Sequence, residues 1–255
     1  MPLGDDPDSQ GRSVLRRSAA IIEAFIDGEC SLTLNQLSAK SGLPKSTVHR
    51  LADRLIEIGW LERTRGSYRV GLRLFEIGTL ADRRTRLIGS AGPHLQAVSK
   101  ETGLAVQLGV LDHTDVVYLE RIPMAGFQLP TRDGGRMPAY CTGLGKAMLA
   151  YANSSDVSAV LEHTLERLTP NTITEPARFR EELDSVRSAG FASDREEACL
   201  GVSCVSAPIR GSGRAIAALS VCGPKDRVDA RLSTVVRHAA TAIWVDLFPL
   251  SARAN

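Results

Sequence analysis

A short basic stretch around residue 45 has the residue types that bind nucleic acid. Lys45, Ser46 and Thr47 come directly after a proline, and His49 and Arg50 follow within one helical turn. Hydroxyl groups and the backbone N–H groups at the start of a helix can hold phosphates, and an arginine can make two hydrogen bonds to a guanine edge. The stretch therefore predicts a helix that reads the major groove of DNA, with Arg50 contacting a base.

The elements around this stretch form the pattern of a helix-turn-helix. Apolar residues predict a helix over 14–27, Thr33 can cap a second helix over 34–40, and 41–43 contains a glycine for the break before a third helix over 44–58. The third helix has apolar residues on one side and polar residues on the other. Three packed helices with a solvated basic face remain the alternative interpretation.

Two short alternating runs joined by a glycine-containing turn at 64–67 predict a β-hairpin after the third helix. Arg63, Arg65 and Arg69 on this hairpin would lie along a phosphate backbone, as the wing of a winged helix-turn-helix. The residues predicted to contact DNA are Thr33, Lys45, Ser46, Thr47, His49, Arg50, Arg63 and Arg65.

The charge distribution supports the same interpretation. The whole chain of 255 residues has a formal net charge of +2, but residues 11–75 hold 11 Lys and Arg against 6 Asp and Glu. The first ten residues contribute a charge of −3, and residues 76–255 are balanced. A positive segment attached to a neutral body is typical of a module that binds a polyanion.

Composition and length indicate a soluble protein of one large or two modest domains, with 43% hydrophobic and 24% charged residues. No apolar run approaches the roughly 20 residues that cross a bilayer. The polar, acidic N-terminus lacks the basic and apolar regions of a signal peptide. We expect a flexible tail over 1–11 and a cytoplasmic protein without membrane contact.

The cysteines are odd in number and scattered, without a CxxC pair or a histidine at zinc-finger spacing. They are Cys30, Cys141, Cys199, Cys204 and Cys222. We therefore expect reduced thiols, with neither a disulfide framework nor a metal site.

Signals for catalysis are weak. Residues 143–146 read Gly-Leu-Gly-Lys, but a P-loop would need glycine at Tyr140 and Ser or Thr at Ala147. No GxSxG motif occurs, and the five histidines lie far apart. A Cys141–His113 pair stays open as a catalytic alternative, with nothing specific to support it. We expect no enzyme activity, no catalytic residue and no cofactor.

The second part of the chain alternates apolar β-branched runs with helical patterns, which predicts an antiparallel α+β domain. A helix over 72–86 should precede it. Pro93 is expected to start a helix that ends near Thr102. The other expected strands are 104–111, 116–122, 202–209 and 215–221, and the other expected helices are 143–151, 155–163, 176–189 and 229–248.

Several stretches resemble the IclR family of bacterial transcriptional regulators. Residues 38–51, Ser-Ala-Lys-Ser-Gly-Leu-Pro-Lys-Ser-Thr-Val-His-Arg-Leu, are similar to its helix-turn-helix, and 138–150, Pro-Ala-Tyr-Cys-Thr-Gly-Leu-Gly-Lys-Ala-Met-Leu-Ala, to a motif beside its ligand pocket. Stretches 190–197, 201–209 and 217–224 complete the match. The resemblance implies a winged helix-turn-helix over 12–71, a linker helix over 72–89 and a GAF-like effector-binding and oligomerisation domain over 90–255.

The resemblance also implies a set of effector-binding residues, which are Leu129, Gly143, Leu144, Asp194, Cys204, Ser220 and Cys222. N–H groups at Gly143 and Leu144 could hold a carboxylate, and Ser220 and Asp194 could exchange hydrogen bonds with the ligand. On composition alone, the two cysteines also suit an apolar core, and Asp194 also suits a turn cap.

Two departures from the family bear on the effector. Many relatives have serine where this chain has Cys222, and a smaller residue at Leu144, so we expect a more apolar organic acid, aromatic ones included, rather than a small keto acid. The implied function is operator binding as a homodimer or homotetramer, on a palindromic duplex, controlled by this acid. Repression and activation stay open. The alternative is a ligand-binding or enzymatic protein without a role on DNA.

Overall fold

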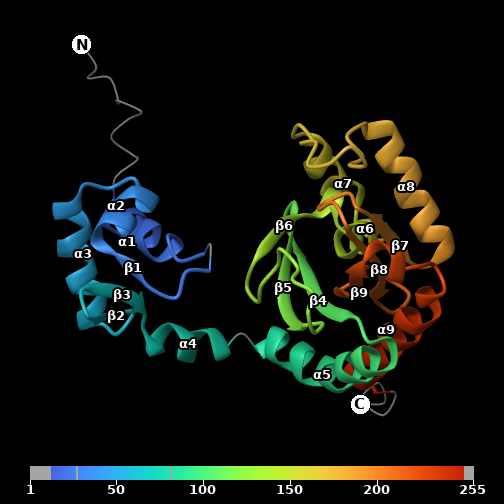
Figure 1. Ribbon diagram of the computed structural model, residues 1–255, viewed down its shortest axis with the longest axis horizontal. Coiled ribbons are helices and arrows are strands. Elements are labelled where there is room, and N and C mark those ends of the chain that lie inside the picture. Colours follow the sequence, from blue (N-terminus) through green and yellow to red (C-terminus); the bar gives the residue numbers. More distant parts are fainter. Residues whose placement is uncertain (1–12, 27, 81, 250–255) are drawn as a thin grey trace. The chain divides into compact units, whose positions relative to one another are not determined.

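The computed structural model describes residues 13–26, 28–80 and 82–249, and the chain forms two compact units, Met1–Asp82 and Arg83–Asn255 (Figure 1). The tail expected over 1–11 lies outside the described residues. The predicted linker segment 72–89 spans the boundary between the units. None of the described helices is long and apolar enough to cross a membrane.

The first unit packs three helices on a three-stranded antiparallel sheet of order β1-β3-β2. Its elements are α1 (Val14–Glu23), β1 (Leu32–Thr33), α2 (Leu34–Ser41), α3 (Lys45–Glu57), β2 (Leu61–Thr64), β3 (Ser67–Val70) and α4 (Leu72–Thr79). Its core includes Ile21, Leu37, Val48, Leu55 and Leu61, all nearly inaccessible to solvent. The predicted helix-turn-helix and hairpin are therefore present.

Local residue chemistry explains the turns of this unit. Thr33 and Gln36 form a reciprocal capping box at the start of α2, and Gly42 ends that helix with a φ of +66°. The β2–β3 hairpin turns through two residues, Arg65 and Gly66, with φ values of +50° and +81°. Positive φ at both central residues suits the right-handed twist of a two-residue hairpin.

The second unit contains a six-stranded antiparallel sheet of order β6-β5-β4-β9-β8-β7. Its strands are β4 (Ala105–Asp112), β5 (Asp115–Ile122), β6 (Arg136–Pro138), β7 (Ala192–Arg195), β8 (Val202–Ile209) and β9 (Ala217–Pro224). Its α-helices are α5 (Asp82–Thr102), α6 (Gly143–Leu149), α7 (Ser154–Leu161), α8 (Pro176–Ala189) and α9 (Leu232–Leu247), with 3₁₀ turns at η2 (Ala139–Cys141) and η3 (Lys225–Arg227). This confirms the predicted α+β class.

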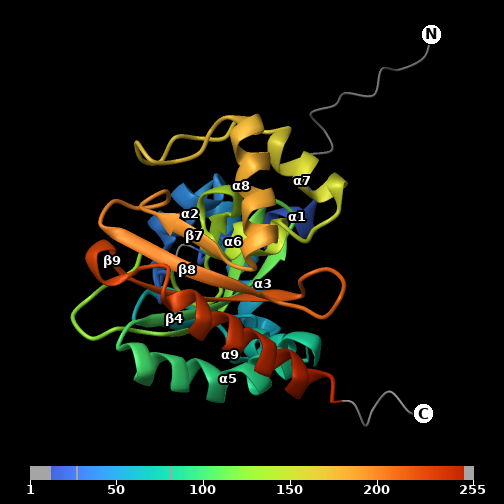
Figure 2. The same cartoon turned by 90° about the vertical axis from the view of Figure 1, so that its right-hand side faces the viewer.

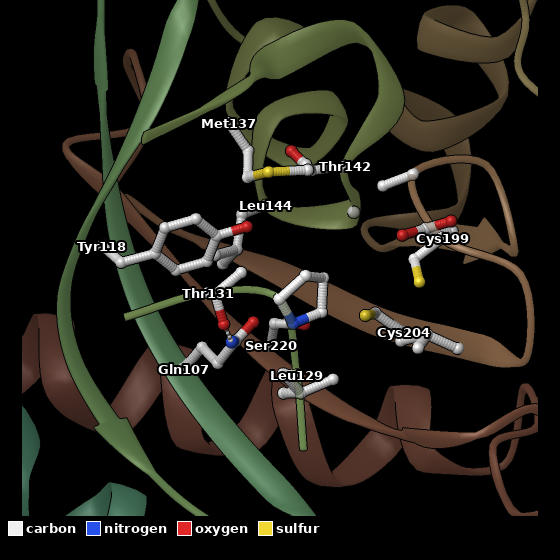
Figure 3. Close-up of a pocket in the computed structure, with 15 residues that line it drawn as sticks. Gln107, Tyr118, Leu129, Thr131, Met137, Thr142, Leu144, Cys199, Cys204 and Ser220 are labelled. Carbon is white, nitrogen blue, oxygen red and sulfur yellow. Dashed lines mark hydrogen bonds between the residues drawn. The ribbon is translucent and has the colours of Figure 1, made fainter. Parts of the chain in front are cut away.

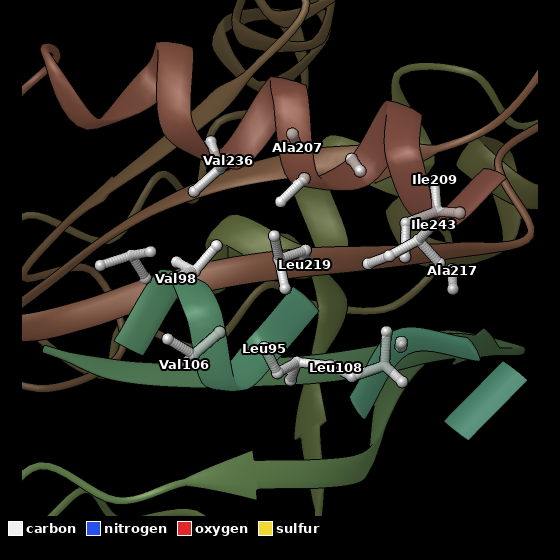
Figure 4. Packing of buried hydrophobic residues seen from close by; sticks show 14 of the residues in the cluster. Leu95, Val98, Val106, Leu108, Ala207, Ile209, Ala217, Leu219, Val236 and Ile243 are labelled. Carbon is white, nitrogen blue, oxygen red and sulfur yellow. The ribbon is translucent and has the colours of Figure 1, made fainter. Parts of the chain in front are cut away.

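Helices cover both faces of this sheet (Figure 2). Helices α5 and α9 lie on one face, where Leu95 and Val98 of α5 and Ile243 of α9 pack against Leu108 and Leu219 of the strands (Figure 4). Helices α6 and α8 pack on the other face. Alternation of side chains along β4, β8 and β9 sends one set into each layer, so both faces of the sheet are buried.

The helix expected to begin at Pro93 instead begins at Asp82 and continues through the proline. The pyrrolidine ring removes the hydrogen bond to the carbonyl of Gly89. Both residues are exposed, so water can satisfy this carbonyl and the helix tolerates the proline. The single helix expected over 72–86 is two helices, α4 and α5. The short strands β1, β6 and β7 were not predicted.

Candidate functional site

The polar side of α3 is open to solvent. Lys45, Ser46, His49 and Arg50 are exposed, and Thr47 is half-buried. The opposite side of the helix is buried in the core through Val48, Leu51, Ala52 and Leu55. Amphipathic packing thus fixes α3 against α1 and α2 and leaves the predicted DNA-contacting residues of this helix on one accessible surface.

Asp53 joins α3 to the wing. Its Oδ2 lies 3.0 Å from Nδ1 of His49, and its Oδ1 accepts a hydrogen bond from Nη2 of Arg63 at 2.5 Å. Arg63 also donates to the hydroxyl of Tyr68 at 3.0 Å and stacks over its ring. Arg63 was predicted as a phosphate ligand, but within the protein its guanidinium positions the wing, so a phosphate would have to compete with Asp53.

The two remaining residues predicted to contact DNA have different surroundings. Thr33 caps α2, where its hydroxyl accepts the N–H of Gln36 at 3.4 Å and donates to the amide oxygen of Gln36 at 2.8 Å. Arg65 is exposed at the tip of the wing. Of the two, Arg65 has the more accessible side chain for a polyanion.

A narrow pocket lies in the second unit, between the start of α6, the sheet and two loops (Figure 3). Six of the seven predicted effector-binding residues line it: Leu129, Gly143, Leu144, Asp194, Cys204 and Ser220. Cys222 lies behind this wall, where its Sγ is 3.0 Å from Oγ of Ser220 and donates to Oε1 of Gln107 at 3.3 Å. The fold therefore brings together residues more than 90 positions apart in sequence.

Sequence reasoning missed several polar and apolar residues of the pocket. They are Gln107, Tyr118, Pro130, Thr131, Met137, Thr142, Ala198, Cys199 and Val202. Two signals for them were present in the sequence. Thr142 and Val202 lie inside stretches that resemble the family, and Gln107 is a polar residue within the apolar run 104–111. A buried polar residue requires a hydrogen-bond partner, and such a residue in a central strand often marks a site.

Gln107 ties a loop over the pocket. Its Nε2 donates to the hydroxyl of Thr131 at 2.6 Å, and Nη1 of Arg121 donates to the carbonyl oxygen of Thr131. The Nε of Arg121 lies 3.2 Å from Asp133. These contacts hold Leu129 and the residues that follow it against the open side of the pocket.

Glycines let α6 approach both the sheet and the preceding 3₁₀ turn η2 closely. A Cβ at Gly145 would collide with the backbone of Ala139, and one at Gly143 would collide with Ser206 of β8. Thr142 caps the helix by accepting the N–H of Gly145 at 3.0 Å. The first α-helical bond is donated by Lys146 N to Thr142 O, so the N–H groups of Gly143 and Leu144 precede it.

Lys146 serves an internal ion network rather than a nucleotide. Its ammonium is fully buried and donates to Glu197 at 2.6 Å, to Glu182 of α8 at 2.9 Å and to the carbonyl of Ser193 at 2.6 Å. These bonds connect α6, α8 and the turn after β7, and they fix the turn that forms one wall of the pocket.

Asp194 faces the pocket from β7, just before that turn. It is 4% exposed, and its Oδ1 accepts the backbone N–H of Glu197 at 2.7 Å. Burial raises the pKa of Asp194 to about 7, against the opposing effect of this hydrogen bond. Asp194 is thus both a turn cap and a pocket residue, which combines the two interpretations of the sequence.

Two cysteine thiols in and near the pocket, those of Cys141 and Cys204, are protonated at neutral pH and therefore poorly reactive. Burial raises the pKa of the Cys141 thiol to about 12. A hydrogen bond with Cys222, together with burial, raises the pKa of Cys204 well above its usual value. All five cysteines are free thiols. Within the described residues, no group of three His, Cys, Asp or Glu side chains could hold a metal ion.

Comparison with known proteins supports the resemblance seen in the sequence. Residues 14–65 match the family model of the IclR helix-turn-helix domain, and residues 80–244 match that of the bacterial transcriptional regulator IclR C-terminal domain. The regulator BhcR of Paracoccus denitrificans is 35% identical over 89% of this chain and 84% of the relative. The regulator KdgR of Escherichia coli is 33% identical over 94% and 92%.

Solved structures give the same result. An IclR homologue from Microbacterium hydrocarbonoxydans, crystallised in complex with 4-hydroxybenzoate, aligns with a TM-score of 0.86 and 31% identity, covering 92% of this chain and 99% of that one. Two matching domains and full-length relatives agree in order and extent. The chain therefore belongs to the IclR family of bacterial transcriptional regulators, with a helix-turn-helix DNA-binding domain followed by an effector-binding domain.

Proposed function

We propose that the chain works as a homo-oligomer whose α3 helices read the half-sites of a palindromic operator, and whose affinity for this operator is set by an aromatic organic acid in the pocket beneath α6. The observation that carries the proposal is the polar, basic side of α3, exposed beside the wing while the apolar side is in the core. Such a regulator acts where the chromosome is, so we place it in the cytoplasm.

The DNA contacts follow from exposure. Arg50 is the candidate base reader, because it extends from the exposed side of α3 and can make two hydrogen bonds to guanine. Lys45, Ser46 and Arg65 are the candidate phosphate ligands, because they lie at the start of α3 and at the tip of the wing. We assign Thr33 and Arg63 mainly to holding these elements in place.

Exposed apolar side chains on and beside α4 support oligomerisation. Leu72, Phe75 and Leu80 are 63%, 69% and 79% exposed, although large apolar side chains favour burial. A second copy of the chain would cover them and pair the two DNA-binding units. Paired units read half-sites separated by one helical turn or a multiple of it, which makes the operator palindromic.

The lining of the pocket supports an aromatic acid as effector. The walls are largely apolar and include Tyr118, Leu129, Met137 and Leu144 (Figure 3). The hydroxyl groups of Thr131 and Ser220 and the amide group of Gln107 can orient a polar ligand. The free volume of about 30 Å³ holds only a few water molecules, so the loop at 129–131 must shift to admit a ring. The 4-hydroxybenzoate complex of the Microbacterium relative supports the same ligand class.

We propose that the pocket binds its ligand without converting it. The raised pKa values of Cys141 and Cys204 keep both as neutral thiols, which are poor nucleophiles. No histidine is among the described residues that line the pocket.

The proposal is tested by recovering and sequencing sheared genomic DNA bound by the purified protein, with and without aromatic acids. Wild type should enrich a palindromic site, and Arg50→Ala should lose this selection while its unfolding midpoint and its acid affinity are unchanged. Equal enrichment by the variant would remove Arg50 as a base reader. If neither protein enriched a site at any salt concentration or acid tested, the operator-binding proposal would fail.

A further inference from the structure

The pocket contains no cationic side chain with which an acid could pair. Of the described residues that line it, none is Arg, Lys or His, and the single carboxyl group is that of Asp194. An acid that enters as a carboxylate therefore comes close to a second carboxyl group. Two adjacent anions in a medium of low dielectric repel each other strongly.

The nearest ammonium group is fully occupied. Lys146 is inaccessible to solvent, and its three donors are directed at Glu182, Glu197 and the carbonyl of Ser193. Two carboxylates and one carbonyl already take its three donors, so it offers no hydrogen bond to a ligand on the other side of the turn. The ammonium group nearest the pocket therefore stabilises the fold and does not bind the ligand.

Titratable groups from several elements face Asp194. They are Lys146 of α6, Glu197 of the turn, Cys141 of η2, Cys204 of β8 and Tyr118 of β5. Burial raises the pKa of Tyr118 and of Cys141 far above neutrality, and the pKa of Cys204 is raised as well, so these three stay protonated. Of the groups facing the pocket, Asp194 is the one that can gain a proton near neutral pH.

We propose that the acid effector and Asp194 share one proton. The effector enters as a carboxylate, the carboxylate of Asp194 takes one proton from solvent, and the resulting O–H donates a hydrogen bond to the carboxylate of the ligand. This inference rests on the proposed acid effector and adds its regulation, because the affinity of the pocket then depends on pH as well as on the acid.

The geometry of Asp194 suits this role. Its Oδ1 accepts the N–H of Glu197 at 2.7 Å and remains an acceptor when the group is protonated, so the proton belongs on Oδ2. An asparagine at this position reproduces the protonated form: its amide oxygen can accept the same N–H, and its NH₂ group can donate to a ligand. Asp194→Asn is therefore a matched variant that needs no proton.

The expected pH dependence of acid binding follows from the fraction of protein in which Asp194 is protonated. The pKa of Asp194 is raised to about 7, so the protonated fraction falls about tenfold for each pH unit above this value. The apparent dissociation constant for an anionic acid rises by the same factor. Well below pH 7, Asp194 already holds its proton, so the dissociation constant no longer changes with pH.

Isothermal titration calorimetry of the full chain with 4-hydroxybenzoate, in buffers of different ionisation enthalpy, measures the proton uptake directly. At pH 8 we expect close to one proton taken up per acid bound, and at pH 6 a small fraction of a proton. Asp194→Asn should bind the acid without proton uptake and with a dissociation constant independent of pH. The uncharged 4-hydroxybenzamide should bind wild type without proton uptake.

Three results would overturn the inference. The first is acid binding to wild type at pH 8 without proton uptake. The second is uptake that persists in Asp194→Asn but disappears in Glu197→Gln, which would place the proton on Glu197. The third is failure of both 4-hydroxybenzoate and benzoate to bind at pH 6, which also removes the acid effector; operator enrichment would then still test the DNA-binding half of the proposed function separately.

Discussion

The ammonium group of Lys146 and the carboxylate of Glu197 meet at 2.6 Å in the interior of the second unit, with side chains 0% and 6% exposed. Glu182 completes the network at 2.9 Å from the same nitrogen. The three charges connect α6, α8 and the turn that follows Asp194 and β7. Buried charges need partners, so loss of Lys146 would leave the carboxylates of Glu182 and Glu197 without their cation. The conformation of the turn that lines the pocket therefore depends on this network.

We expect Lys146→Met to lower the free energy of unfolding by about 3–5 kcal/mol, since it leaves two carboxylates without their buried cation. Urea denaturation of the full chain measures the change. Glu182→Gln is the matched control: Glu182 is 22% exposed and Lys146 keeps Glu197, so its loss should be smaller. A Lys146→Met protein as stable as wild type would show that the network contributes nothing to folding.

The stability of wild type should fall between about pH 4 and pH 7. Burial raises the pKa of Asp194 to about 7, and the unfolded chain releases this proton near pH 4. Between these values only the folded state holds the proton, so the free energy of unfolding decreases with pH, by up to roughly 4 kcal/mol, and is constant above pH 7. Burial raises the pKa of Glu197 too, which acts in the same direction.

The difference between wild type and Asp194→Asn isolates this effect, because other titrating groups are common to both proteins. Urea denaturation at several pH values should show the variant gaining stability relative to wild type as the pH rises. If the free energy of unfolding changed with pH in the same way for both proteins, Asp194 would not hold the proton in the folded state.

Strong periodic patterns made much of the fold predictable. The helices of the first unit, the hairpin and the long strands β4, β5, β8 and β9 all follow from apolar spacing and turn residues. Strand β6 has three residues, too few for alternation to be visible. Strand β7 has four residues, like β2 and β3, but it lacks the adjoining two-residue turn and partner run that made the β2–β3 hairpin predictable. Pro93 predicted the start of a helix. In the structure α5 continues through Pro93, because the proline is exposed and water can satisfy the carbonyl that loses its hydrogen bond.

The candidate site was predictable mainly where a family motif covered it. Asp194 and Ser220 lie in stretches that resemble the family, and the resemblance also implied Leu129, which lies outside those stretches. Tyr118 and Thr131, which no motif covered, enter the pocket by strand register and loop closure. The role of Lys146 depends on partners 36 and 51 residues away, which no local pattern reveals. Long-range packing decides which polar residues come into contact. The spacing of residues along the sequence does not reveal these contacts.

Asp53→Asn should strengthen nonspecific DNA binding. The change removes the carboxylate that holds His49 at 3.0 Å and Arg63 at 2.5 Å, so Arg63 becomes available to a phosphate. Each added phosphate contact steepens the logarithmic salt dependence of affinity by about 0.9. Fluorescence anisotropy of a random duplex across salt concentrations should show the steeper slope, with affinity at low salt higher by about three- to tenfold.

Glu57→Gln is the control for Asp53→Asn, since it removes the same charge one turn further along α3, from an exposed pair with Arg54. Its slope should stay near that of wild type, because Glu57 has no contact with the wing in the described structure. Equal slopes for all three proteins would mean that Arg63 stays with Tyr68 and away from the phosphates. Stability should change little, because exposed ion pairs contribute about 0–1 kcal/mol.

Phe75→Ser combined with Leu80→Ser should dissociate the proposed oligomer. Both side chains are more than two-thirds exposed, and each would contribute about 1.5–3 kcal/mol if a second copy buried it. Analytical ultracentrifugation should show a lower mass for the variant at the same concentration, and operator affinity should fall with it. Leu200→Ser, which changes an apolar residue 60% exposed outside α4, should leave the mass unchanged. A wild type that is monomeric at micromolar concentration, or a variant that keeps the wild-type mass, would show that α4 is not the contact between copies.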